Sequence, residues 1–319
     1  MCFKGKDGAL IWQYCFNRKT GDSANIKALM LRDTAILRFA NGRVECIEFE
    51  MADSRWDKKN IAEEYDAYVP LKGYASTPLF YDGKLFINPG AQDASIVALD
   101  PKTGETIWKT PGRRASRSDF IAAEFGGAKQ LVGFDHDSLG GWDVKSGARL
   151  WQLDTSDRIE DASEKIFESN GQLLASTSDG ATTLYRFNAN GTLDEKPVAR
   201  NTDSKRQIQA LAGRLALSIG DGVNCLNLDA GLRECWQLDE TEIPNSAFVL
   251  VESARIAVFS SDGIVSIFEI NATKPERRAT WKLCDAIVAQ PIVSGGKLFV
   301  RSATRLYCFE IDSRGIGLK

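Results

Sequence analysis

The stretch ALDPKTGETIW, residues 98–108, has the pattern of a β-hairpin. An apolar segment leads into Asp100-Pro101-Lys102-Thr103-Gly104, and a second segment follows and ends at Trp108. Proline fixes φ near the value that a turn needs, aspartate bonds to nearby backbone N–H groups, and glycine adopts a positive φ without strain. The stretch therefore predicts two short strands joined by a tight turn.

The hairpin recurs along the chain, and its spacing indicates the fold. A series of tryptophans ends the copies, at Trp12, Trp56, Trp108, Trp151, Trp236 and Trp281. Successive members lie 43 to 52 residues apart, except for one interval of 85 residues, which indicates a member without tryptophan near Leu193–Pro197. Polar turns that enter an apolar strand recur in parallel, near residues 33, 82, 127, 170, 213, 254 and 296. Repeats of roughly 40–50 residues with about four strands each are typical of β-propeller blades.

A third series consists of small residues on the strand before each tryptophan. Its members are Cys2, Cys46, Ala98 and Gly141, each ten residues before a tryptophan of the series, and Cys225 and Cys308 in the matching strand of later repeats. A small side chain makes room for a large one in a close-packed interior, so we expect the tryptophan to pack over this position. Trp142 lies outside the series, and we expect Trp142→Ala to destabilise the protein far less than Trp108→Ala.

Residues 98–108 and 141–151 resemble the tryptophan-docking motif of pyrroloquinoline-quinone-type repeats, and residues 2–12 and 46–56 match it in part. The resemblance covers essentially the whole chain. The chain is similar to the quinone-like repeat propellers of the outer-membrane assembly lipoprotein family. It implies that the tryptophans of the series wedge between neighbouring blades. It also implies an exported protein, periplasmic or extracellular, whose exposed loops bind protein partners. Such families usually lack the active site of quinoprotein dehydrogenases.

The hairpin count predicts an all-β fold, a single propeller domain over residues 1–319 with about seven four-stranded blades. Seven first-strand turns but six following outer strands leave Trp12 unassigned. We therefore expect residues 1–16 to supply the outer strand of the last blade, which closes the ring and removes exposed edges. Residues 57–73 are predicted to be an inserted loop with a short helix. The resemblance leaves an alternative of eight blades, in which Met1 lies inside a blade and a signal segment precedes it.

The bulk composition limits the classes of partner. A formal net charge of −3 gives no basic field, so nucleic acid is not expected as a partner. No apolar run approaches 18 residues, so we expect no membrane span. The start MCFKGK lacks the apolar segment of a signal peptide. A hydrophobic content of 43% suffices for a sizeable core, and we expect a monomer.

The cysteines and the histidine offer few sites for chemistry. We expect the cysteines at small-residue positions to be buried thiols. Cys225 and Cys235 flank the turn Asp229-Ala230-Gly231 and are candidates for a disulfide across it. The absence of Cys-x-x-Cys argues against zinc. His136, the one histidine, is a weak candidate metal ligand, because its neighbours Asp135 and Asp137 alternate faces along an extended chain.

Polar residues at the starts of inner strands are candidates for binding a ligand or partner at the propeller mouth: Arg117, Asp119, Arg206, Gln209 and Gln290. Arginines at the rim could accept carboxylate or sulfate. We assign no catalytic residue and no cofactor, since the sequence has no Cys-Cys pair and no convincing Glu, Asn and Asp set for the calcium of a quinoprotein dehydrogenase. We therefore predict a non-enzymatic binding or scaffold propeller. The alternative is a degenerate oxidoreductase that uses pyrroloquinoline quinone.

Overall fold

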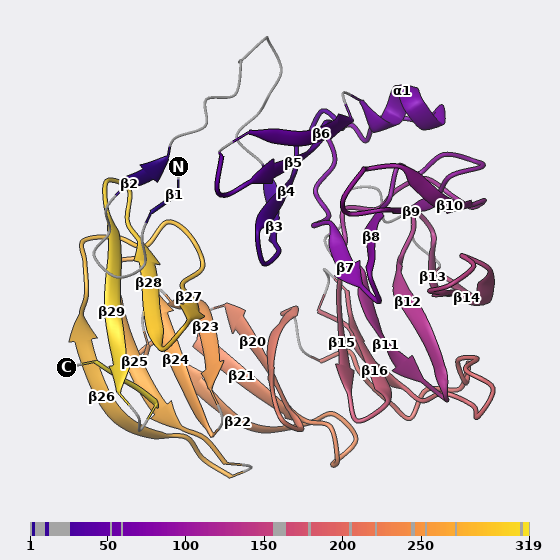
Figure 1. Cartoon of the computed structure of the whole chain (residues 1–319). Coiled ribbons are helices and arrows are strands. Elements are labelled where there is room, and N and C mark those ends of the chain that lie inside the picture. Colours follow the sequence, from indigo (N-terminus) through magenta and orange to yellow (C-terminus); the bar gives the residue numbers. More distant parts are fainter. Residues whose placement is uncertain are drawn as a thin grey trace. The chain divides into compact units, whose positions relative to one another are not determined.

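The computed structural model describes residues 2–3, 10–12, 26–51, 53–58, 60–155, 164–177, 180–203, 206–220, 222–243, 246–252, 254–271, 273–312 and 315–318. Within these residues the chain forms strands β1 to β30 and one short helix, α1 (Ile61–Tyr65) (Figure 1). The chain divides into two compact units. Unit 1 comprises residues 1–172 and 186–195, and unit 2 comprises residues 173–185 and 196–319.

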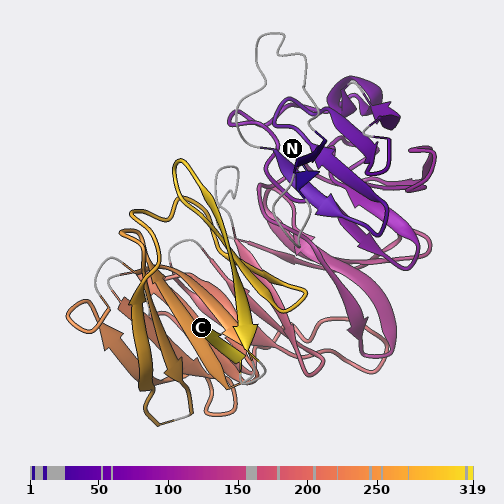
Figure 2. The same cartoon turned by 60° about the vertical axis from the view of Figure 1, so that its left-hand side comes forward.

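Unit 1 contains three complete four-stranded antiparallel sheets, named blades 1 to 3 in chain order. Blade 1 consists of β3 (Lys27–Met30), β4 (Thr34–Arg38), β5 (Val44–Glu48) and β6 (Ser54–Lys58). Blade 2 consists of β7 (Leu79–Tyr81), β8 (Lys84–Ile87), β9 (Ile96–Leu99) and β10 (Thr106–Thr110). Blade 3 consists of β11 (Ile121–Phe125), β12 (Ala128–Phe134), β13 (Ser138–Asp143) and β14 (Arg149–Asp154). Strands that follow one another in the chain are neighbours in each sheet, so each blade takes up a narrow span of the colour scale (Figure 2).

The boundary between the units falls within blade 4, which consists of β15 (Lys165–Ser169), β16 (Gln172–Ser176), β17 (Thr182–Tyr185) and β18 (Ala199–Asn201). Unit 2 contains blades 5 to 7. Blade 5 consists of β19 (Ile208–Ala212), β20 (Leu215–Gly220), β21 (Gly222–Asn227) and β22 (Arg233–Asp239). Blade 6 consists of β23 (Ser246–Glu252), β24 (Arg255–Ser260), β25 (Ile264–Glu269) and β26 (Glu276–Lys282). Blade 7 consists of β27 (Ile292–Ser294), β28 (Lys297–Arg301), β29 (Leu306–Asp312) and β30 (Gly315–Leu318).

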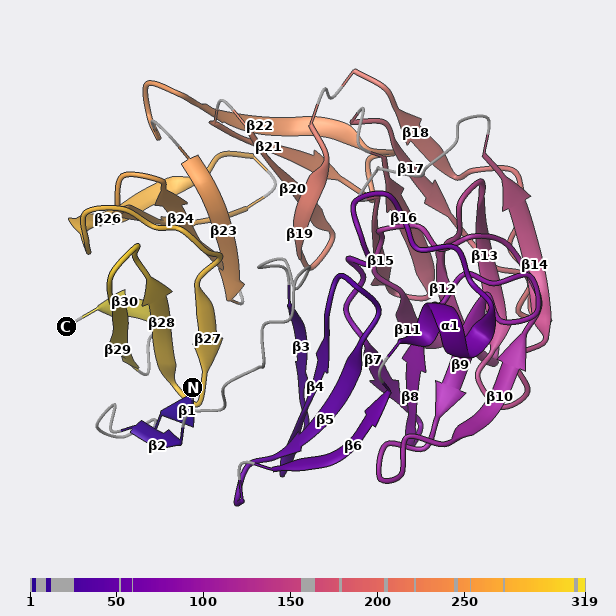
Figure 3. The same ribbon diagram turned by 90° about the horizontal axis from the view of Figure 1, so that it is seen from above.

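The described residues thus form seven four-stranded antiparallel sheets and almost no helix, which is the architecture of a seven-bladed β-propeller. The predicted fold class and the count of about seven blades are confirmed. Helix α1 lies within segment 57–73 and beside β10 (Figure 3), where the Tyr65 hydroxyl is 2.7 Å from Thr106 Oγ1. None of the described helical residues forms a helix long and apolar enough to cross a membrane. That residues 1–319 make one domain stays a prediction.

The N-terminal strand does not complete the last blade, so this part of the sequence prediction is wrong. β30 fills the fourth position and pairs with β29 through Ile311 opposite Leu318. β1 (Cys2–Phe3) and β2 (Leu10–Trp12) pair with each other in a separate two-stranded sheet. Residues 315–318, GIGL, had little strand character because glycine weakens a strand, but a short edge strand needs backbone pairing on one side only.

The tryptophans of four blades hold the same place in their sheets. Trp56 pairs with Cys46, Trp108 with Ala98, Trp151 with Gly141 and Trp236 with Cys225. A β-bulge next to each pair leaves the residue before the tryptophan as the extra one. Trp281 is two residues out of this register, because the bulge of blade 6 precedes Ala279 and Trp281 pairs with Val265.

Burial changes the expected ranking of two tryptophans. Trp142 has 0% exposure, whereas Trp108 is partly exposed. The Trp142 ring packs edge-on against Phe120, with ring centroids 5.7 Å apart, and the Arg149 guanidinium lies 4.2 Å from its centroid. The expectation that Trp142→Ala is the milder substitution therefore conflicts with the structure. Trp142 is outside the repeated series, but its side chain belongs to a buried cluster that joins residues of blade 3 to Phe86, Ile96 and Ala98 of blade 2.

The buried-thiol prediction holds for two of the small-residue cysteines. Cys46 and Cys225 are buried, but Cys308 is exposed. Cys308 lies on β29 before the two residues that pair with β30, so no fourth strand covers it. The side chain of Cys2 lies outside the described residues.

Candidate functional site

The indole of Trp56 in blade 1 lies on the turn between the third and fourth strands of blade 2. Its Nε1 donates a hydrogen bond to Pro101 O (3.0 Å). A Cβ added to Gly104 would lie 2.7 Å from Trp56 Cδ2, so the indole occupies the space above this glycine. We call the space above such a turn glycine, where the preceding blade places its indole, a tryptophan cradle. The cradle exists because position 104 has no side chain.

A similar contact recurs in other blades. Trp108 donates to Val144 O (3.3 Å) in blade 3, and a Cβ on Gly147 would lie 2.6 Å from its ring. In unit 2, Trp236 of blade 5 donates to Asn271 O (2.9 Å) of blade 6. These turns therefore each receive the polar edge of an indole from the blade before.

The remaining tryptophans of the series differ. Trp151 donates to Gln130 Oε1 (2.7 Å) within its own blade and meets Phe187 edge-on, with centroids 5.7 Å apart. Trp281 is partly buried and packs against the core of blades 6 and 7. The side chain of Trp12 lies outside the described residues.

Blade 4 has no tryptophan on its fourth strand, where Arg200 of β18 pairs with Thr183 of β17. Arg200 is exposed, and its neighbour Ala199 has its Cβ 4.0 Å from a Cβ built on Gly231 of the blade 5 turn. The sequence places the member without tryptophan near Leu193–Pro197, and a bridge between Phe187 and Leu193 closes a turn at the start of this segment.

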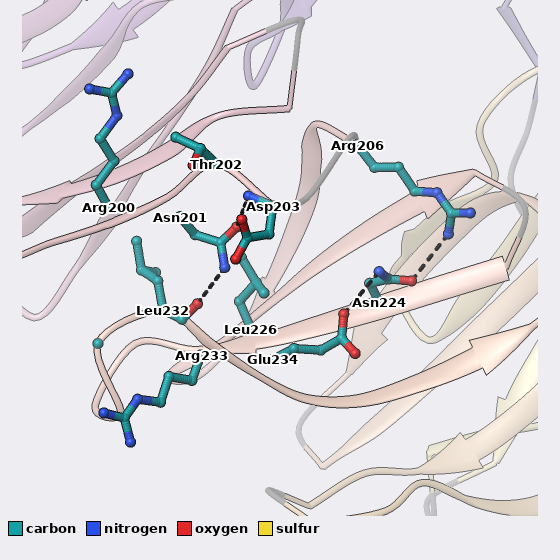
Figure 4. A pocket seen from close by; sticks show the side chains of 11 residues that line it. Arg200, Asn201, Thr202, Asp203, Arg206, Asn224, Leu226, Leu232, Arg233 and Glu234 are labelled. Carbon is teal, nitrogen blue, oxygen red and sulfur yellow. Dashed lines mark hydrogen bonds between the residues drawn. The ribbon is translucent and has the colours of Figure 1, made fainter.

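A pocket of about 640 Å³ lies in unit 2 beside Arg200. Its wall consists of residues 200–203, Arg206, Asn224 and Leu226 of β21, and residues 231–234 of the blade 5 turn (Figure 4). Leu226 and Leu232 are buried and form the apolar part of this wall. The sequence candidate Arg206 lines this pocket, and its role in binding stays a prediction.

The polar groups of this pocket bond to one another. Arg206 Nη1 donates to Asn224 Oδ1 (3.1 Å), and Asn224 Nδ2 donates to Glu234 Oε2 (3.3 Å). Asn201 Nδ2 donates to Leu232 O (2.9 Å), which joins β18 to the blade 5 turn. The network fixes the pocket wall in unit 2.

The arginines of the pocket do not form an anion clamp. Figure 4 shows the Arg200 and Arg233 side chains directed away from each other and away from the Arg206 guanidinium. Asp203 and Glu234 add two carboxylates to the same wall. The arginines predicted to accept carboxylate or sulfate are Arg113, Arg114, Arg117 and Arg206; of these, Arg206 lines this pocket, and the binding stays a prediction.

Two other sequence candidates hold loops of unit 1 together. Arg117 Nη1 donates to Lys72 O and Gly73 O, both at 3.0 Å. Asp119 Oδ1 accepts a hydrogen bond from the Thr77 backbone N (2.6 Å). Both side chains form hydrogen bonds with backbone groups of distant segments. These bonds hold the loops of unit 1 together.

Gln209 and Gln290 are exposed in unit 2. Gln209 lies on β19, and Gln290 lies in the loop before β27. Neither residue lines the pocket beside Arg200. A binding role for either residue stays a prediction.

His136 lines a second pocket, of about 660 Å³, in unit 1. Arg113 Nη1 lies 2.5 Å from Asp137 Oδ1, and Arg114 lies over the Tyr68 ring at 4.7 Å. Asp135 turns inward and is buried, where its carboxylate bonds to Ser138 and to Arg149 (3.0 Å). The described residues contain no group of three His, Cys, Asp or Glu side chains that could hold a metal ion.

A buried arginine in unit 1 escaped the sequence analysis. Arg38 has 1% exposure, and its guanidinium donates to Ser76 Oγ and Asn88 Oδ1, both at 2.5 Å. It also lies 4.6 Å from the Tyr74 ring centroid. Burial lowers the pKa of Arg38 to about 10 and raises the pKa of Tyr74 to about 12. The single sequence signal is a charged residue inside the apolar run AILRFA, and the contacts join blade 1 to blade 2.

The seven sheets and the recurring place of tryptophan on the fourth strand define a β-propeller of the pyrroloquinoline-quinone-like repeat class. The chain belongs to the family described as outer membrane protein assembly factor BamB, whose model matches residues 2–237 and 92–316. The family predicted from the repeats is thereby confirmed.

One curated protein and two solved structures are also similar to the chain. Outer membrane protein assembly factor BamB of Burkholderia pseudomallei is 26% identical over 163 residues, which are 48% of this chain and 40% of that protein. The matched segment thus spans about two fifths of the curated relative. Among solved structures, BamB from Moraxella catarrhalis has a TM-score of 0.60 at 15% identity, over 88% of this chain and 80% of its own. The C-terminal WD40 domain of Sif2 has a TM-score of 0.59 at 12% identity, over 86% and 76%. These two structures support the fold alone.

Proposed function

We propose that the protein is a non-enzymatic scaffold that binds another protein during the assembly of outer-membrane proteins. The observation that carries the proposal is the family match, which extends over nearly the whole chain. A relative matched over part of its length is named an assembly factor for outer-membrane proteins. The pocket beside Arg200 offers hydrogen-bonding groups of both charges, which suits recognition of a protein surface.

The same argument supports a periplasmic location for the protein, whereas its monomeric state stays a prediction. Outer-membrane proteins are assembled at the membrane that borders the periplasm, so a scaffold for them works in that compartment. The net charge of −3 favours a protein partner over nucleic acid. The hydrogen bonds from their indoles to the following blade support a structural role for Trp56, Trp108 and Trp236, which we propose hold neighbouring blades together.

We propose no cofactor for this scaffold. The alternative, a degenerate oxidoreductase using pyrroloquinoline quinone, has no specific observation in its favour, and we derive no chemical step for it. Equilibrium dialysis of the protein with the quinone and calcium tests the alternative. We expect no retained quinone, and retention of about one equivalent would favour the oxidoreductase.

Deletion of the gene in the organism that encodes it tests the scaffold proposal. The readout is the amount of folded outer-membrane β-barrel protein, which resists unfolding in unheated detergent samples. We expect the folded fraction to fall and to recover when the gene is restored. Unchanged folded fractions in the deletion strain would contradict the proposal.

A further inference from the structure

We propose that Cys225 and Cys235 are a modification site, at which a disulfide forms and ties together the two strands that carry one wall of the pocket beside Arg200. The inference rests on the proposed function, because a scaffold for outer-membrane proteins works in the periplasm, which is an oxidising compartment. It goes beyond that function by assigning a covalent bond and the part of the molecule that the bond stabilises.

The bulge of blade 5 brings the two sulfur atoms together. Cys225 on β21 pairs with Trp236 on β22. The next pair joins Leu226 to Glu234, which leaves Cys235 as the extra residue of the bulge. Its Sγ lies 3.1 Å from Cys225 Sγ and 3.4 Å from Cys225 O. The sulfur atoms of a disulfide are about 2 Å apart, so the bond forms after a movement of roughly 1 Å.

Blade 5 differs from three other blades with this bulge, because it has a cysteine at both positions. In blade 1, Cys46 takes the place of Cys225, but the extra residue of the bulge is Arg55. In blades 2 and 3 an alanine and a glycine take this place. Cys46 is therefore a buried thiol in the same register without a second cysteine in the bulge, and it serves as an internal control.

The burial of the two thiols suits a stable bridge that an oxidant can still reach. Cys225 has 0% exposure and belongs to the apolar cluster of blades 5 and 6. Cys235 packs against the same cluster but is only partly buried. An oxidant therefore reaches Cys235 first, and Cys225 lies close enough to complete the exchange.

The step is a thiol–disulfide exchange with an oxidising disulfide, either glutathione disulfide or the disulfide of an oxidoreductase. The Cys235 thiolate attacks one sulfur of the oxidant, and the other sulfur leaves as a thiolate with the electron pair of the broken bond. The Cys225 thiolate then attacks Cys235 Sγ in the mixed disulfide and displaces the remaining sulfur of the oxidant. The two cysteines lose two protons and two electrons, and the oxidant is reduced to two thiols.

The bridge joins the strands that carry one wall of the pocket. Asn224 and Glu234 each precede one of the cysteines, both line the pocket, and Asn224 Nδ2 donates to Glu234 Oε2 (3.3 Å). The loop that the bridge closes, residues 226–234, contains Leu226 and residues 231–234 of the pocket wall. A covalent link across the base of this loop limits the separation of β21 and β22. The disulfide therefore stabilises this wall.

The first test uses the full chain as it exists in the cells that encode it. Cells are lysed in denaturing buffer with iodoacetamide, which alkylates every thiol that is free at that moment, and the protein is mapped by mass spectrometry. We expect a linked peptide pair that carries Cys225 and Cys235, together with alkylated Cys46. Alkylation of both Cys225 and Cys235 overturns the inference, and so does a link from either of them to a different cysteine.

The second test measures whether the bridge acts on the pocket wall. After reduction of the folded protein with a phosphine, backbone amides of residues 222–239 should exchange hydrogen at least about tenfold faster, because the strands open more often. Amides of β5, which carries Cys46, should keep their rates. Cys235→Ser should show the fast rates without a reductant. Equal rates in the oxidised and reduced wild type overturn the role in the pocket wall, and this comparison needs no variant to fold.

These readouts separate the disulfide from the proposed function. If the deletion strain keeps its folded outer-membrane proteins, the scaffold function fails, whereas a linked peptide from residues 225 and 235 still supports the disulfide. If both thiols are alkylated while the deletion strain loses folded outer-membrane protein, the disulfide fails and the scaffold function stands.

Discussion

The turns of blades 2 and 5 both contain a glycine with a positive φ but differ in backbone and in neighbours. Gly104 and Gly231 have φ values of +73° and +70°, but in blade 5 the next residue, Leu232, also has a positive φ of +60°. The indole of Trp56 covers Gly104, whereas Gly231 faces a pocket of about 640 Å³. The comparison teaches that the turn glycine of a repeat can be a packing contact in one blade and border an open pocket in another.

The largest expected effect compares the loss of stability at Trp142, which is fully buried, with the loss at Trp108, which lies in a cradle. Trp142→Ala removes a side chain with 0% exposure, and we expect a loss of about 4 kcal/mol in the free energy of unfolding. Trp108→Ala, at a partly exposed cradle, should cost less. Chemical denaturation of both variants measures the difference, and a larger loss for Trp108→Ala would favour the ranking expected from the repeats.

The next effect compares a tryptophan that covers a turn with an exposed arginine beside the pocket of unit 2. Trp56→Ala empties the cradle over Gly104 and should cost about 2–3 kcal/mol, below the range for a fully buried tryptophan because Trp56 is partly exposed. Arg200→Ala removes an exposed side chain and should change stability by about 0.5 kcal/mol or less. Urea unfolding of the pair is the measurement, and similar losses for the two would contradict the packing role of Trp56.

A pair of glycine substitutions sharpens the comparison at the turns themselves. Gly104→Ala and Gly231→Ala both force a side chain into a positive φ, at a cost of about 1–2 kcal/mol each. Only the alanine at position 104 also meets an indole, so Gly104→Ala should be about 1–2 kcal/mol worse than Gly231→Ala. Equal melting shifts would show that the space above Gly231 is not open.

The smallest effect concerns two thiols of blade 5. Cys225 and Cys235 have their Sγ atoms 3.1 Å apart, because the bulge places Cys235 beside Cys225 rather than on the opposite face. We expect oxidised glutathione to convert the two thiols into one disulfide and to release two molecules of reduced glutathione. Burial raises the pKa of the Cys225 thiol, so its thiolate forms only as the pH rises and the exchange should accelerate with pH.

Peptide mapping by mass spectrometry measures this bridge against a Cys235→Ser control. The wild type should lose two reactive thiols, and the control should instead carry one glutathione at most. Two glutathione adducts on the wild type, with no linked peptide, would contradict the predicted pairing.

The repeats made the blades predictable because each blade repeats a short-range pattern of turn and apolar strand. The pairing of Trp108 with Ala98 followed from the same spacing. Blade 4 was predicted as a repeat without tryptophan, but the bounds of its short fourth strand, Ala199–Asn201, had no distinguishing pattern in the sequence.

The site was less predictable than the fold, since it depends on contacts between distant residues. Arg206 was identified as a candidate, but its partner Asn224 lies in another strand and had no distinguishing signal. Arg117 and Asp119 look like rim residues in the sequence, but backbone groups more than forty positions away engage both side chains. The exposure of Cys308 depends on how short β30 is, which the spacing of the repeats does not specify.

The position of the Trp56 indole, determined by crystallography of the protein, tests the central claim most directly. We expect its N–H to donate to Pro101 O and its ring to lie over Gly104 of the next blade. An indole that points into solvent would contradict the claim that tryptophans of the series pack on the turn of the following blade.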